Sequence, residues 1–256
     1  MSPFRQSVHS EAFVLAMDRS IGELFVRHLS LFGTLSEADR HALLNIKGRI
    51  GVVEKGQDIL HVGDKPTHVV AVLSGMLQRY TLDAEGERQI HSFYLGGDVP
   101  SLEGLHIDVM DNALGAVTTS RVALVTHVDM FALLHAHPNL AALCWRETLV
   151  QAAVFREWLA RNSKKLAHAQ TAHLFCEMIT RAKANGLSDG KSMSLPVTQK
   201  DLADALGMSV VHVNRTLQTL RSTGEVELKN GILTIGDFGT VADLAGFDPA
   251  YLHLTA

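Results

Sequence analysis

The strongest constraint on the fold is the stretch "VTQKDLADALGMSVVHVNRTLQTLRSTGEVELKNGILTI", residues 197–235, which places two short helices and a hairpin in a fixed order. Thr198 can cap a helix that ends at Gly207, and a glycine there allows the tight turn that two crossing helices need. Ser209 can cap the second helix. The Asn-Gly pair in "LKNGIL" is a typical turn between two strands. The order helix, turn, helix and hairpin predicts a winged helix-turn-helix.

The second predicted helix has an inner and an outer face. The apolar positions that would join the two helices are Leu202, Ala203, Leu206, Val213, Leu217 and Leu220. The outer positions are Val210, Val211, Asn214, Arg215 and Gln218. In a DNA groove we expect Arg215 to bind guanine and Asn214 to bind adenine, while either valine can touch a thymine methyl or simply pack. The positions expected at backbone phosphates are Thr198, Gln199, Ser209 and His212.

The charge distribution permits DNA binding but does not demand it. The net charge is -4, yet residues 1–160 carry 13 Lys and Arg against 18 Asp and Glu, whereas residues 161–256 carry 10 against 9. A DNA-binding surface needs local positive charge rather than a basic chain. The residues that can supply it are Arg161, Lys164, Lys165, Lys200, Arg215 and Arg221. A helix-turn-helix can also be a structural helical hairpin, so the wing and the upstream helix matter to the prediction.

Residues 50–127 are punctuated by glycines at short intervals. Between them lie the strand-like runs "HVVAVLSG", "MLQRYTL", "RQIHSFYL" and "RVALVTHV", and "DAEGE" is a turn between two of these runs. Many short strands at regular spacing favour an antiparallel β-roll, or jelly roll, over a parallel sheet. Upstream, "SEADRHALLNI" begins with the capping-box pair Ser36 and Asp39 and predicts a short helix.

From Pro138 the amino-acid composition changes, because the next 27 or so residues contain neither glycine nor further proline. This predicts one long helix whose apolar positions cover two faces. One face can pack on the β-roll and the other on the same helix of a second copy, and the alternative is burial within one monomeric core. The following stretch, "AQTAHLFCEMITRAKANG", predicts a second helix that stops at Asn185 and Gly186. "LSDGKSMS" is then expected to be a polar loop.

Composition limits the class of protein. A chain of 256 residues with 46% hydrophobic residues can fill two cores. The apolar run "AFVLAM" is too short to span a bilayer and has no cleavage-site pattern, so we expect a cytoplasmic protein without a membrane span. Cys144 and Cys176 are the only cysteines, which is too few for a disulfide scaffold or an iron–sulfur cluster.

The glycine-punctuated roll, the long helix after "HP" and the segment "TQKDLADALGMSVVHVNRTLQTLRSTGEVELKNGILTI" together resemble the Crp/Fnr family of bacterial transcription regulators over roughly residues 30 to 236. The resemblance implies an α+β fold: a cyclic-nucleotide-binding-like β-roll (double-stranded β-helix), a long central dimerisation helix and a C-terminal winged helix-turn-helix. It also implies a homodimer on a near-palindromic DNA operator, with RNA polymerase as a further partner. The expected boundaries are an N-terminal extension at 1–29, the roll at 30–137, the dimerisation helix at 138–166, and the DNA-binding domain with its tail at 167–256.

The sequence departs from the cyclic-AMP-binding pattern of that family. Aligned without gaps, Leu102 stands where those members have Glu, Asn112 where they have the phosphate-binding Arg, and Ala113 where they have Ser. Glu103 is displaced by one position, and one residue turns a strand side chain to the other face. A buried phosphate without a cation is costly, so cyclic AMP is not expected and the effector is unknown. Phe155 and Arg156 complete the candidate effector pocket.

Two further departures concern metals and the operator. The iron–sulfur members carry an N-terminal cysteine cluster, which is missing before Cys144. Val211 replaces the Glu of common half-site readers, so we expect a different operator base pair there. The histidines of the roll have no recognised ligand spacing, and no metal site is expected.

The alternative function is a ligand- or metal-sensing module that acts through protein partners with a degenerate helix-turn-helix. An enzyme is a third hypothesis, but no catalytic motif occurs in the sequence.

Overall fold

The computed structural model describes residues 13–16, 19–164 and 166–255. Their contacts divide the chain into two compact units. The first unit holds the described residues up to Thr81, together with Ser92–Leu149 and Thr255. The second holds Leu82–His91 and Val150–Leu254, so a short segment from the first half of the chain belongs with the C-terminal half.

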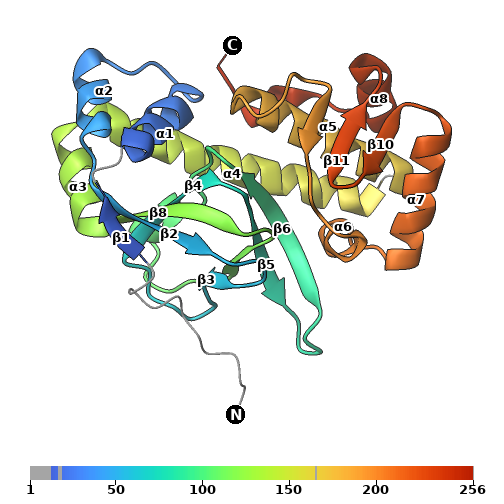
Figure 1. The fold of residues 1–256 in the computed structure, drawn as a ribbon, viewed down its shortest axis with the longest axis horizontal. Helices are drawn as coiled ribbons and strands as arrows, with labels where there is room; N and C mark the ends of the chain where they lie inside the picture. Colours follow the sequence, from blue (N-terminus) through green and yellow to red (C-terminus); the bar gives the residue numbers. More distant parts are fainter. Residues whose placement is uncertain (1–12, 17–18, 165, 256) are drawn as a thin grey trace. The chain divides into compact units, whose positions relative to one another are not determined.

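The first unit contains two four-stranded sheets (Figure 1). One sheet has the order β1 (Phe13–Ala16), β2 (Gly48–Val53), β8 (Ser120–Thr126), β4 (His68–Ser74). The other has the order β3 (Asp58–Leu60), β7 (Ala113–Ala116), β5 (Met76–Leu82), β6 (Arg88–Leu95). Both sheets contribute to one core cluster, which includes Val53, Val70, Val72, Leu77, Tyr94, Leu114 and Val122. This arrangement confirms the predicted β-roll.

Short helices complete this unit: α1 (Arg19–Ser30), α2 (Glu37–Leu44), η2 (Leu102–Leu105) and α3 (His127–Ala136). The capping box of α2 is confirmed, because Ser36 accepts a hydrogen bond from the Asp39 N–H and the Asp39 side chain accepts one from the Ser36 N–H. Helices α1 and α2 pack closely at Gly22, where a Cβ would lie 2.6 Å from the Leu43 carbonyl oxygen.

The prediction that the strand "RVALVTHV" continues through Val128 is wrong. β8 ends at Thr126, and the Thr126 hydroxyl accepts a hydrogen bond from the Asp129 N–H at 3.0 Å to cap α3. The threonine suits both a strand and a helix cap, so the apolar run alone did not indicate where the strand stops.

The two predicted central helices are confirmed. α4 (Pro138–Lys164) is a single helix of 27 residues, and its first part belongs to the first unit and its remainder to the second. α5 (Ala167–Ala184) ends at Asn185, followed by Gly186 with φ +71. A positive φ at this position ends the helix in the way that glycine permits.

The second unit carries a helix-turn-helix and a three-stranded sheet. The helices are α6 (Gln199–Leu206) and α7 (Val210–Ser222), and the wing is β10 (Val226–Lys229) with β11 (Ile232–Ile235). The polar stretch predicted to be a loop instead contains β9 (Ser192–Ser194), which pairs antiparallel with β11. Only Met193 of β9 is buried, so this short polar strand is specified by its neighbour and not by its own pattern.

The C-terminal tail forms α8 (Phe238–Ala245) and η3 (Pro249–Leu252), and α8 packs on α5. Tyr251 stacks on His173 of α5 and donates a hydrogen bond to the buried Glu177 carboxylate at 2.7 Å. Trp158 of α4 donates to the same carboxylate oxygen at 2.8 Å. One buried acid therefore joins α4, α5 and the tail within the second unit.

Candidate nucleic-acid interface

The two helices of the helix-turn-helix are set by their caps. Thr198 caps α6 and Ser209 caps α7, each accepting a hydrogen bond from the N–H three residues on. Between them, Gly207 has φ +63, the left-handed conformation that glycine adopts without strain. The core positions predicted for this contact are buried except Leu217, which is half-buried, and Thr216 takes part in the buried face instead.

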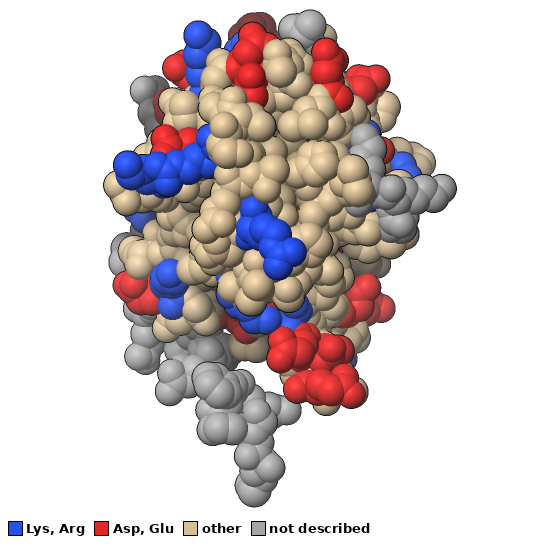
Figure 2. Space-filling model, turned by 90° about the vertical axis from the view of Figure 1, so that its right-hand side faces the viewer, with Lys and Arg blue, Asp and Glu red and all other residues tan. Residues whose placement is uncertain are grey.

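The outer face of α7 carries the residues expected to read bases. Val211 is 70% exposed, Arg215 and Gln218 are exposed, and Asn214 is partly exposed, while Val213 between them is fully buried. In Figure 1, α7 lies at the right-hand side, and Figure 2 faces that side: isolated basic side chains stand on a largely uncharged surface, with acidic side chains gathered nearby. An exposed valine pair thus belongs to this surface and not to the core.

Two of the predicted contact residues are joined to one another. The Asn214 side-chain amide donates to the Gln199 side-chain carbonyl at 3.2 Å, from α7 to the first residue of α6. An amide has two N–H groups and one carbonyl oxygen. With one N–H given to Gln199, the other N–H and the oxygen remain available, and these are the donor and acceptor that adenine requires.

The residues predicted to contact phosphates differ in the hydrogen-bond donors that they still have available. The Thr198 hydroxyl accepts from the Asp201 N–H and donates to the Asp201 carboxylate at 2.7 Å, so its proton is already used within the capping box. Ser209 accepts from the His212 N–H at 3.2 Å and keeps its proton for another acceptor. His212 is exposed beside it on the first turn of α7. The N-terminus of α7 therefore presents a hydroxyl and an imidazole.

Three of the six basic residues considered for this surface are paired within the second unit. Arg161 donates to Glu157 and to the Ala245 carbonyl, and Arg221 lies 3.3 Å from Glu227. Lys200 contacts two carboxylates. Among the described residues, Arg215 makes no ion pair, which leaves its guanidinium available on the outer face of α7. Lys165 lies outside the described residues, as does the side chain of Lys164.

The candidate effector residues of the first unit surround an arginine that the sequence analysis did not select. Arg79 of β5 donates to the Tyr94 hydroxyl at 3.0 Å and to the side-chain amide oxygen of Asn112 at 2.7 Å. It also donates to the Pro100 carbonyl and pairs with Glu103. Leu102 and Ala113 are buried. The signal that could have found Arg79 is strand parity, because it stands two residues after the core residue Leu77 and so lies on the inward face.

Burial shapes the charge states of this cluster. Burial alone would lower the pKa of Arg79, but the neighbouring Tyr94 and Glu103 more than offset it, so the pKa is raised and the guanidinium is charged. Burial raises the pKa of Glu103, and Arg79 opposes that rise. The guanidinium thus has four acceptors from this chain, and an arginine with a full set of partners has few N–H groups left for a ligand.

The other two candidate pocket residues, Phe155 and Arg156, lie on the part of α4 that belongs to the second unit. Both are exposed, and the ring of Phe155 lies 5.7 Å from that of His91. Of the six predicted pocket residues, the structure therefore brings together Glu103 and Asn112 around Arg79, with Leu102 and Ala113 on the adjoining η2 and β7.

Within the described ranges, no three His, Cys, Asp or Glu side chains gather as a group that could hold a metal ion. Both cysteines are buried free thiols, and burial raises the pKa of each to about 12. Over the same part of the chain, no helix combines the length and hydropathy needed to cross a bilayer.

Comparison with known proteins identifies the region that holds the helix-turn-helix. The family model of the Crp-like helix-turn-helix domain matches residues 169–243. The chain is 27% identical over 242 residues to electron transport regulator A of Shewanella oneidensis, covering 94% of each protein. It is also 27% identical over 213 residues to the fumarate and nitrate reduction regulatory protein of Escherichia coli (strain K12), covering 83% of this chain and 85% of that protein.

Among solved structures, the chain is similar to FixK2 from Bradyrhizobium japonicum, with a TM-score of 0.69 and 23% sequence identity. The likeness covers 77% of this chain and 96% of that one. It shows that the two share a fold, and the sequence relatives above carry the functional comparison.

Proposed function

Because the chain belongs to the Crp/Fnr family of transcription regulators, we propose that it acts as a homodimer that reads a near-palindromic operator through α7 and answers to a signal at its β-roll. The family consists of DNA-binding transcription regulators and not of enzymes, and the chain is a regulator of this class. The observation that carries the proposal is the outer face of α7, where Arg215 is exposed and Asn214 is partly exposed on a helix capped by Ser209.

Each position on that face has an assigned partner in the proposal. Arg215 binds guanine O6 and N7, and Asn214, oriented by Gln199, binds adenine. Val211 meets a thymine methyl, with Val210 beside it and Gln218 one turn further along. Ser209 and His212 contact backbone phosphates at the N-terminus of α7, where the helix dipole favours an anion. At α6, the backbone N–H of Gln199 serves the same purpose, because Thr198 gives both its N–H and its hydroxyl proton to Asp201.

The exposed face of α4 supports the homodimer. Trp145 and Leu159 are 69% and 64% exposed, and Leu149 and Phe155 are exposed on the same helix. Large apolar side chains that recur along one exposed face of a helix mark an interaction surface. A two-fold pair of α4 helices would cover them and would place two copies of α7 for two half-sites.

The remaining parts of the proposal follow from DNA binding. The relatives named above are bacterial regulators, and we propose that this protein acts in the bacterial cytoplasm with RNA polymerase as a partner. The effector is unidentified and is not cyclic AMP, since Asn112 replaces the phosphate-binding arginine and Arg79 is already occupied by Glu103.

An electrophoretic shift experiment tests this function. The protein is titrated onto a fragment of its own upstream region and onto a random fragment of equal length, at salt concentrations from about 50 to 200 mM. We expect a discrete retarded band on the upstream fragment that survives an excess of random DNA. If both fragments bind equally at every salt concentration, α7 is not a sequence-specific reader.

A further inference from the structure

The tip of the β5–β6 hairpin, residues 82–91, belongs to the second unit. Its turn is closed by a hydrogen bond from the Asp83 N–H to the Glu87 carbonyl at 3.0 Å, and Gly86 has φ +84. The Asp83 carboxylate accepts from the N–H groups of Glu85 and Glu87 at 3.0 and 2.8 Å. The turn is thus held rigidly by its own backbone and carries three acidic residues.

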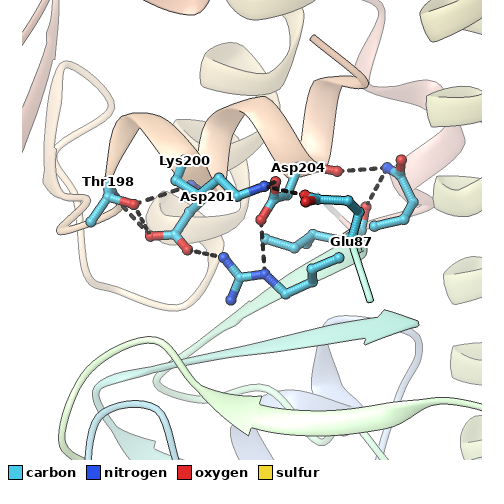
Figure 3. Close-up of polar contacts among 8 residues, drawn as sticks. Glu87, Thr198, Lys200, Asp201 and Asp204 are labelled. Atoms are coloured by element: carbon cyan, nitrogen blue, oxygen red, sulfur yellow. Dashed lines mark hydrogen bonds and ion pairs between the residues drawn. The ribbon is translucent and has the colours of Figure 1, made fainter. Parts of the chain in front are cut away.

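The tip is anchored to α6, the first helix of the helix-turn-helix. Arg88 donates from Nη2 to Asp201 at 2.6 Å and from Nε to Asp204 at 2.9 Å, as Figure 3 shows for the two aspartates that point from α6 toward the hairpin. Gln89 adds a hydrogen bond from Nε2 to the Asp204 carbonyl oxygen at 2.6 Å. Three directional contacts fix the tip along one side of this helix.

This anchor differs from an exposed surface ion pair. Asp201 and Asp204 are buried, and Asp201 is also the residue that completes the α6 capping box. Burial alone would lower the pKa of Arg88, but its hydrogen bonds to Asp204 and Asp201 raise it. Removing one partner of such a pair leaves a buried charge without compensation. The tip therefore stays on α6 unless a competing interaction replaces its contacts.

The hairpin tip also forms an ion pair with Lys200, a cation that could otherwise bind a DNA phosphate. Lys200 is the second residue of α6, and its Nζ lies 3.0 Å from Glu87 and 2.8 Å from Asp204. The N-terminus of this helix is where a duplex phosphate is expected, because unpaired backbone N–H groups and the helix dipole meet there. Glu87 is 72% exposed, so its carboxylate stands at the surface beside that position.

We propose that the hairpin tip is an autoinhibitory contact: Glu87 holds Lys200 in an ion pair and must yield it to a DNA phosphate before the helix-turn-helix binds tightly. The proposal rests on the proposed function, since it assumes that this unit reads DNA. Arg88 keeps the tip in place during the exchange, and Glu87 is the part that competes. When a DNA phosphate binds Lys200, the tip loses the ion pair between Glu87 and Lys200, and the phosphate gains Lys200 as its partner.

The test is the substitution Glu87→Gln, which removes the competing charge of the hairpin tip and leaves the Arg88 anchor and the Lys200–Asp204 pair intact. DNA affinity is measured by fluorescence anisotropy on the upstream fragment over a salt titration. We expect Glu87→Gln to bind about two- to tenfold more tightly at low salt, and its salt dependence to steepen by about one phosphate contact. Glu87 is exposed, so folding is not at risk.

Two comparisons make the result specific. Glu85→Gln removes a carboxylate from the same turn that lies outside the Lys200 ion pairs of the described residues, and we expect a smaller gain with an unchanged salt slope. In a Lys200→Ala background, Glu87→Gln should give no gain. Equal or weaker binding by Glu87→Gln, or the same gain without Lys200, overturns the proposal. Failure of DNA reading itself is distinguishable, because the unsubstituted protein would then bind the upstream and random fragments equally.

Discussion

Under the proposed function, Arg215 is the residue on which we expect specific binding to depend most. Its guanidinium is exposed on the outer face of α7 and is not paired among the described residues. A bidentate arginine–guanine contact is worth about 1 to 3 kcal/mol of discrimination against the wrong base. We therefore expect Arg215→Ala to weaken operator binding by that amount, as measured by anisotropy, with little change on random DNA.

The matched control is Arg221→Ala, near the end of the same helix. It removes the same charge, but Arg221 is already paired with Glu227. Its loss should weaken binding to operator and random DNA to a similar and smaller extent, because a distant charge contributes only electrostatically. Equal loss of specificity in both variants contradicts the assignment of Arg215 as a base reader.

At the scale of single residues, local sequence patterns predict which side chains are exposed, but they do not predict contacts between residues that are far apart in the sequence. The outer face of α7 was predictable because helix periodicity places Val213 inside and Val211 and Arg215 outside. That the Thr198 proton is used within its own capping box was not predicted, although Asp201 three residues on is the pattern for it. Arg79 meets Asn112 from 33 positions away, and no local pattern can show such a pairing.

At the scale of single elements, the N-terminus of α2 is tied to α4 through one carboxylate. Burial alone would raise the pKa of Asp39, but hydrogen bonds from Asn139 and Ser36 outweigh it and lower the pKa to about 2. A folded-state pKa below the ordinary value of 3.8 stabilises the fold above that pH. This stabilisation is lost as the pH falls from about 4 toward 2.

The variant Asp39→Asn isolates this effect. We expect it to unfold at lower urea concentration than the unsubstituted protein at pH 5 to 7, because the neutral amide cannot accept the same charged hydrogen bonds. The difference should shrink as the pH is lowered from about 4 to about 2.5, since the carboxyl of Asp39 is then becoming protonated. A difference that stays constant over this pH range shows that Asp39 acts by shape alone.

The C-terminal tail is the second element whose contribution can be measured. Burial and the Glu177 carboxylate raise the pKa of Tyr251 far above its usual range, so its hydroxyl stays a donor at all ordinary pH values. Tyr251→Phe removes this hydrogen bond and keeps the ring on His173. A hydrogen bond to a charged group contributes about 1.5 to 3 kcal/mol, and we expect a loss of about that size in urea unfolding followed by circular dichroism.

An unchanged unfolding midpoint in Tyr251→Phe indicates that the remaining donors, Trp158 and Arg181, satisfy Glu177 without the tyrosine. Elements with their own caps, such as α2 and α6, were predictable, since cap and periodicity agree. β9 was not, because three residues with one buried side chain carry too little pattern to oppose a loop assignment. The tail's position on α5 depends on burial of Phe247 and Leu252, which composition alone does not locate.

At the scale of the whole molecule, the proposed assembly decides whether two recognition helices act together. Helix α4 has exposed apolar side chains at Trp145, Leu149 and Leu159. Their exposure to water is unfavourable in free energy, and a second copy that covered them would remove this penalty. In the proposed assembly, one copy of α7 would cover one half-site, and two copies fixed by a symmetric contact would cover both halves of a palindrome one helical turn apart. Operator affinity should therefore depend on the oligomeric state.

Leu159→Glu tests this dependence, because a two-fold contact would bring the new carboxylate close to its own copy. We expect sedimentation to show a monomer where the unsubstituted protein is a dimer. Operator affinity should fall by about 10³-fold or more, toward that for random DNA, since one half-site alone supplies too few contacts. Leu187→Glu, which places the same charge at another exposed leucine of the second unit, should leave both properties unchanged. A Leu159→Glu protein that remains a dimer with full operator affinity places the dimer interface elsewhere on the molecule.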